Sequence, residues 1–277
     1  MLSSPAAAVE AVSPLTGNRP VTRSSIMARI RPLARAPITE ALVDLRVQPA
    51  DGMTVERLEQ ALKTRNFGYH RKGPILRSHF GIVMNLQDGS PAQRVMGGST
   101  FIGVRLHSED DKYVAQFTTE GFTVSRLEPY ESWDALVAEA QRVWPEYRAC
   151  VVPVSVHRAA TRFINNLRLP LKPGERFERY LTGLPMMPPE YPQTVSSFLQ
   201  RFVVQDDACG ATAIVTQALE QVPQTPPVPV ILDIDVFREA RFPPDTMQVW
   251  DYLAELRALK NRLFFGALTE DALRLYE

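Results

Sequence analysis

Hydrophobic and polar positions alternate along residues 38–48, as they do in a β-strand. In the segment ITEALVDLRVQ the positions from 39 to 47 that share one face are small or apolar, a period of two that is typical of a half-buried strand. The opposite face carries the three charges of Glu40, Asp44 and Arg46. The pattern predicts a strand with one side fit for a core and one polar side.

Three other segments show the period of 3.6 residues that is typical of amphipathic helices. The first starts at Thr54, a good N-cap, and continues over residues 55–62. The second, residues 133–147, has a nearly complete apolar stripe, so it has to pack on a sheet or another helix. The third follows a pair of prolines and spans residues 245–264.

Short runs rich in Val, Ile, Phe and Thr occupy most of the remaining chain. Between residues 76 and 127 they are separated by Gly and Asp clusters, which indicates an antiparallel meander. The run at 155–170 is long for one strand, so we expect a bulge near Ala159 and Ala160. Three further strands are expected after the Pro-rich segment 171–192.

The order of these elements indicates the α+β class. Strands outnumber helices, and the helices interrupt runs of strands without alternating with them one to one. We expect a largely antiparallel sheet of about eight or nine strands with three long helices. Residues 31–277 should form a single domain, and the element order hints at two similar halves, 38–150 and 151–277, although no sequence repeat supports them.

The first 30 residues differ from the rest of the chain. They are rich in Ser, Pro and Ala and lack apolar periodicity, so we expect a disordered or loosely attached tail. Five arginines and one glutamate lie between Met1 and Ile38, a faint likeness to a transit peptide. A simple tail, or a true start at Met27, is the simpler interpretation.

Total charge and cysteine content restrict the partner classes. The chain has 31 Lys+Arg against 31 Asp+Glu and four histidines, whereas binders of phosphate backbones or membrane surfaces usually have a basic excess. Neither nucleic acid nor a membrane is therefore favoured by the total. No apolar run approaches the roughly 20 residues of a membrane span. Two cysteines, Cys150 and Cys209, are too few for a disulfide framework, and a cytoplasmic location fits best.

A second polar row is expected in the strand at 155–170. If that strand lies beside the one at 38–48, acids face arginines and form either a structural ion-pair network or a polar pocket. The pocket interpretation predicts an anion-binding surface, because guanidinium groups bind carboxylate or phosphate in bidentate fashion. The members of this second row are Arg158, Arg162, Asn166 and Arg168.

Asp233 and Asp235 form a third row in the run LDIDV. Two carboxylates at i and i+2 of a strand could hold Mg²⁺ or Mn²⁺ if phosphate oxygens or waters complete the shell, with Glu40 or Asp44 as further ligands. An isolated Asp-x-Asp is a weak signal. The simpler interpretation is a pair of acids on a solvated or arginine-paired sheet face, and no cofactor is expected with it.

No specific catalytic motif occurs in the sequence. The four histidines lack metal-ligand spacing, and the glycine-rich run at 97–103 lacks the Lys-Ser/Thr ending of a P-loop. We expect a non-enzymatic binding or interaction protein that self-associates and whose partner is a protein or a small anionic ligand. The alternative is a metal-dependent enzyme that acts on a phosphorylated or nucleotide-like substrate through Asp233 and Asp235.

Several phrases together carry a family resemblance. They include API-EALVDLRV, RLEPYESW, RFINNLRLP, LDIDVF and LKNRLFFGALTE, within residues 36–47, 126–147, 155–170, 232–237 and 259–273. This set resembles an uncharacterised, sporadically distributed bacterial and archaeal protein family of about this length. The resemblance implies one integrated domain and no mechanism. Since some members lie in variable, defence-rich genome regions, it also implies an accessory role in a defence or mobile-element system.

Overall fold

A computed structural model places most of the chain. It describes residues 28–277 except 84–92, 173–174, 185–187, 189, 193–194 and 221–224. The expected tail at residues 1–30 therefore lies almost entirely outside the described residues.

The described residues form nine strands and four α-helices, and the first helix is only eight residues long. The strands are β1 (Ile38–Gln48), β2 (Tyr69–Val83), β3 (Gln93–Ser108), β4 (Tyr113–Thr118), β5 (Gly121–Leu127), β6 (Ser155–Leu169), β7 (Phe198–Asp206), β8 (Ala211–Leu219) and β9 (Val228–Phe242). The helices are α1 (Val55–Leu62), α2 (Trp133–Val151), α3 (Gln248–Gly266) and α4 (Glu270–Leu273).

All nine strands belong to one antiparallel sheet, in the order β2-β3-β4-β5-β1-β6-β9-β8-β7. The expected α+β fold with a mostly antiparallel sheet is confirmed. β1 and β6 lie side by side in the middle, and the later strands follow outward from each in descending order. A long helix comes after the last strand of each series, α2 after β5 and α3 after β9.

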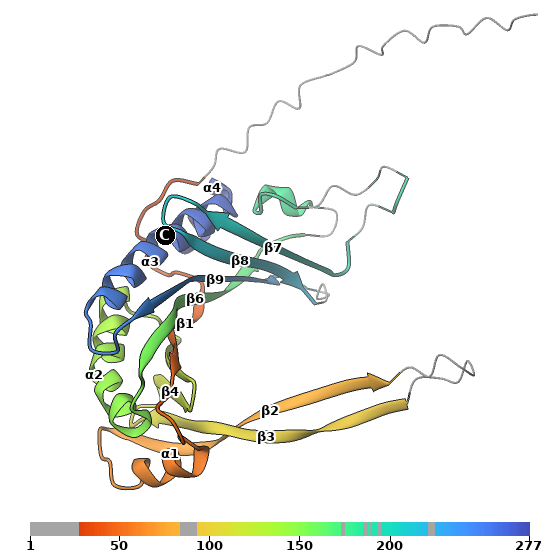
Figure 1. Cartoon of the computed structure of the whole chain (residues 1–277). Helices are drawn as coiled ribbons and strands as arrows, with labels where there is room; N and C mark the ends of the chain where they lie inside the picture. The colour runs from red at the N-terminus through yellow and green to blue at the C-terminus, as the bar shows by residue number, and fades with distance from the viewer. Residues whose placement is uncertain are drawn as a thin grey trace, which may run out of the picture.

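The helices cover only one face of the sheet. α2 packs on β5 and β1, and α3 packs on β9, β6 and β8. Figure 1 shows both helices along the outside of a bent sheet, while the inside of the bend has no helix layer. We call this uncovered side the open face; it carries Glu40, Asp44 and Arg46 of β1 and the side chains in register with them on the other strands.

The covered face forms the core through the alternation that the sequence shows. Ala41, Val43 and Leu45 are completely buried because every second side chain of β1 points at the helices. Aromatic rings fix α2 on β4 and β5. The ring of Phe122 lies 5.1 Å from that of Trp144 in an edge-to-face contact, a geometry that adds about 1 kcal/mol beyond area burial.

The expected bulge in β6 lies slightly earlier in the strand than Ala159 and Ala160. Ala159 and Ala160 stay in a regular ladder with β9, whereas the register shifts between Val156 and Arg158. Both alanines are buried, and their small side chains fit the regular pleat. The bulge falls close to the start of β6, where the ladder with β1 also shifts, so most of β6 keeps a single register.

β2 and β3 extend beyond the rest of the sheet. β4 pairs with β3 only between Gly103 and His107, so residues 76–83 and 93–102 pair only with one another. Figure 1 shows this hairpin leaving the body as an arm. Gly103 stands where the arm begins; a Cβ atom there would lie 2.8 Å from the Cα of Thr118 and still closer to the carbonyl oxygen of Phe117.

Candidate binding face

The strand order brings the three predicted polar rows together. β1, β6 and β9 are consecutive in the sheet, and their ladders place the three rows on the open face. The convergent residues are Glu40, Asp44 and Arg46 on β1, Arg158, Arg162, Asn166 and Arg168 on β6, and Asp233 and Asp235 on β9.

Asp44 and Arg158 form the centre of this face. Asp44 is only 6% exposed, and its carboxylate accepts from Arg158 Nη1 at 2.9 Å and Arg46 Nε at 3.0 Å. Thr123 Oγ1 of β5 donates to its second oxygen at 2.8 Å. Arg158 also reaches Asp235 Oδ2 at 3.2 Å. One guanidinium thus links the acids of two strands on either side of β6.

Arg162 and Asp233 make a separate bidentate pair. Arg162 Nε donates to Oδ1 at 2.8 Å and Nη2 donates to Oδ2 at 2.5 Å. The hydrogen bonds that Arg162 donates to Asp233 raise the pKa of its guanidinium above the ordinary value, so this side chain stays charged. Burial raises the pKa of Asp235, although Arg158 and Arg162 oppose that rise.

Other residues of the predicted rows lie outside these pairs. Glu40 and Arg168 make no ion pair within the part of the chain that the structure describes. The Asn166 Oδ1 atom is buried without a hydrogen-bond partner, and so is Ser125 Oγ on β5. Buried polar atoms are normally satisfied, so these two positions of the open face have hydrogen-bonding capacity that the described protein atoms leave unused.

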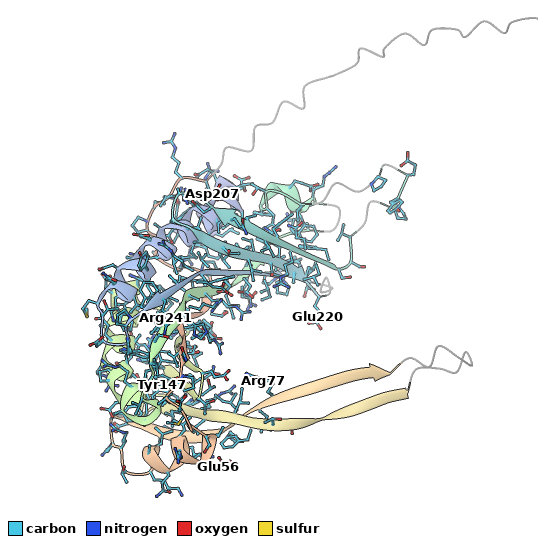
Figure 2. All side chains as sticks on the ribbon, viewed as in Figure 1. Glu56, Arg77, Tyr147, Asp207, Glu220 and Arg241 are labelled. Atoms are coloured by element: carbon cyan, nitrogen blue, oxygen red, sulfur yellow. The ribbon has the colours of Figure 1, made fainter. Side chains whose placement is uncertain are left out.

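Five exposed arginines of the open face have no ion-pair partner among the described residues. Two belong to β3 and β2: Arg105 lies opposite Gln116 of β4, and Arg77 lies near the root of the arm in Figure 2. Arg77 shares its side of β2 with Gly73, which pairs with Arg105. The complete set is Arg77, Arg105, Arg168, Arg201 and Arg241.

The polar rows predicted from the sequence did not include Arg77, Arg105 and Arg201, nor Thr123 and Ser125. β8 follows the same period of two as β1, whereas β7 is exposed on both sides along most of its length, so only its pairing with β8 assigns Arg201 to the open face. The order of the strands in the sheet is also needed, because it determines which polar side chains of different strands lie on the same face. For instance, Arg201 pairs with Thr216, which in turn pairs with Asp233.

Two hollows adjoin the polar rows, and both are open to solvent. One, of about 450 Å³, is lined by Arg105, His107 and Leu127 among others. The other, of about 420 Å³, is lined by Arg46 and His157 among others. Deeply enclosed pockets are typical of small-molecule sites, whereas these shallow, arginine-lined hollows suit an extended ligand that lies over the surface.

The geometry gives no support to the metal interpretation. Both carboxylate oxygens of Asp233 accept from Arg162, and Asp235 accepts from Arg158. Among the described residues, no three His, Cys, Asp or Glu side chains gather in a metal-binding arrangement. A cation at Asp233 would have to displace a guanidinium that already neutralises the carboxylate.

We therefore expect no saturable Mg²⁺ or Mn²⁺ binding to the wild-type protein in calorimetric titrations up to millimolar metal, with phosphate present. Arg162→Ala frees Asp233 and serves as the comparison. Saturable binding to the wild type that disappears in Asp233→Asn would instead support the metal-dependent enzyme.

Comparisons with known proteins do not assign this chain to a family. No family model matches the chain, and a search of curated proteins found no match. The family resemblance of the sequence therefore stays a prediction. None of the helices in the described part of the chain combines the length and apolar character needed to cross a membrane.

Proposed function

We propose that the protein is a non-enzymatic binding protein that holds its partner on the open face of the sheet. The observation that carries this proposal is the asymmetry of the sheet: one face is covered by α2 and α3, while the other keeps its charged rows uncovered. Exposed arginines without an ion pair among the described residues support it further. Buried, paired charges alone would give a structural network. The exposed arginines are not part of those ion pairs, so they are available to a partner.

The β7 edge supports the proposed self-association. Leu199 is 75% exposed and Val203 is 61% exposed, and Phe202 and Val204 are exposed as well. An outer strand also presents unpaired backbone groups, which another strand can pair with. A cytoplasmic location and an accessory role in a defence or mobile-element system complete the proposal; the second rests on the family resemblance.

Capture from a cell extract tests which surface binds. The open-face variant carries Arg105→Glu with Arg201→Glu, and the matched control carries Arg148→Glu with Arg257→Glu on α2 and α3, an equal charge change. We expect a component that the wild type and the control retain and the open-face variant loses. The purified component should then bind the open-face variant at least tenfold more weakly than the wild type.

Circular dichroism and thermal melting confirm that each variant is folded before the comparison. If all three proteins retain the same components with the same affinity, the open face is not the binding surface and the proposal fails.

A further inference from the structure

We propose that the partner on the open face is a double-stranded nucleic acid. Arginines on both flanks of this face hold the duplex at its phosphates. This inference rests on the proposed function and names its ligand. The total charge of zero does not favour such a ligand, but the charges are unevenly distributed over the molecule.

The charged residues of strands β2 and β3 are all basic. The two strands contain no Asp or Glu, although the average content of the chain would place about three there. Arg71 is neutralised by Glu59 of α1 at 2.6 Å, but Arg77 and Arg105 are exposed and unpaired among the described residues. The basic residues of these strands are Arg71, Lys72, Arg77, Arg94 and Arg105.

The middle of the open face has no positive surplus. Arg46, Arg158 and Arg162 are matched there by acids within hydrogen-bonding distance. Glu40 and Glu239 also reach this face without an ion partner in the described part. Unneutralised positive charge therefore remains at Arg77 and Arg105 on one side and at Arg201 on the other, with Arg168 and Arg241 near the ends of β6 and β9 between them.

The separation of these arginines selects an extended ligand. Arg105 on β3 and Arg201 on β7 are seven strand steps apart in the sheet, about 34 Å along its surface at ~4.8 Å per step. One small anion cannot contact both. A double helix carries a negative charge about every 1.7 Å of its axis and completes a turn in about 34 Å, so it presents phosphates over the whole span.

The shape of the sheet disfavours a flat ligand. The open face lies on the inside of the bend (Figure 1), with the arm and the β7–β9 strands projecting on either side of the ion-paired middle. A planar bilayer would meet those projecting parts before it reached Arg105, which lies at the root of the arm opposite Gln116 of β4. A rod-shaped polyanion can lie along the inside of the bend and contact both sides.

The scarcity of free aromatic rings favours a duplex over a single strand. Single-stranded ligands are held largely by stacking of bases on exposed aromatic side chains. On the described open face, Phe237 is already covered by the Arg158 guanidinium at 4.3 Å from its ring centroid. Phosphate contacts by arginines need no unstacked bases, and they depend strongly on salt.

Fluorescence anisotropy with a labelled 30-base-pair DNA duplex and the full-length protein tests the inference. We expect saturable binding that weakens steeply between 50 and 200 mM salt. Arg105→Glu with Arg201→Glu should weaken binding at least tenfold and reduce the slope of log Kd against log salt by about 2, or ~0.9 per lost phosphate contact. Each single replacement should give part of that loss, since both sides contact the duplex.

The control variant with Arg148→Glu and Arg257→Glu should bind the duplex within twofold of the wild type. Absence of duplex binding, tighter binding of a single strand, equal weakening of the control, or binding only to vesicles with anionic lipids would each overturn the inference. If the duplex fails but a partner captured from extract still requires Arg105 and Arg201, the proposed function stands without this ligand. If neither depends on those arginines, both proposals fail.

Discussion

Replacement of Lys260 by methionine is expected to stabilise the protein by about 2–4 kcal/mol at pH 6–7. Lys260 lies on α3 and is only 7% exposed. Its ammonium lies 3.8 Å from the centroid of the Phe163 ring, and it has no carboxylate partner among the described residues. Burial, helped by the charge of Arg257, lowers the pKa of Lys260 from 10.5 to about 7.

The direction of the pH dependence follows from that lowered pKa. Below pH 7 the folded and unfolded states are both protonated at Lys260, so the cost of the buried charge is fully present. Between pH 7 and about 10.5 the unfolded state binds more protons, and the stability contribution of this group rises with pH. The cation–π contact with Phe163 offsets part of the cost, whereas methionine fills the same space without a charge.

Denaturant titrations at pH 6, 8 and 10 check this expectation. The advantage of Lys260→Met over the wild type should be largest at pH 6 and should shrink toward pH 10. Lys260→Arg is the control, because it keeps the charge at every pH and should show no gain. A methionine variant no more stable than the wild type at pH 6 would show that the ammonium is well accommodated.

The second large effect is expected at Gly103, where alanine should destabilise the protein by about 2–4 kcal/mol. A Cβ atom there would meet backbone atoms of Phe117 and Thr118. Backbone in a sheet cannot yield as a flexible side chain can, because β4 is also held by its ladder with β5. The strand pair at the root of the arm would have to separate.

Gly73→Ala is the matched control on the facing strand. Gly73 pairs with Arg105 in β2, and a Cβ atom there meets nothing within 4 Å. Chemical denaturation of both variants should give a large loss for Gly103→Ala and a change within about 0.5 kcal/mol for Gly73→Ala. Equal losses would mean that glycine is required in this hairpin for a reason other than close approach.

Local alternation predicted much of the candidate face. A period of two assigns Glu40, Asp44 and Asp233 to the polar side of their strands from the sequence alone, because side-chain direction in a strand is a local property. The partners of these acids are not local. Asp44 and Arg158 are 114 positions apart, and only the order of strands in the sheet brings them into contact.

The same limit explains what was missed. The total charge sums over all faces of the protein. A chain with 31 basic and 31 acidic residues can therefore contain strands without acids, such as β2 and β3, and still have a net charge of zero. The pair Asp233 and Asp235 resembles a metal site in isolation, because nothing nearby in sequence shows that Arg162 occupies one of the carboxylates. Sequence patterns predicted which way these side chains point but not what they meet.

The central ion pairs have a consequence for how β1 and β6 pair. β1 and β6 each carry charges on one side and apolar residues on the other, so a slip of one residue between them would turn Asp44 under the helices. The pairs thus lock the seam whether or not a ligand binds. In related sequences we therefore expect Asp44 and Arg158 to be conserved. The residues at positions 77, 105 and 201 should vary with the ligand that each protein binds.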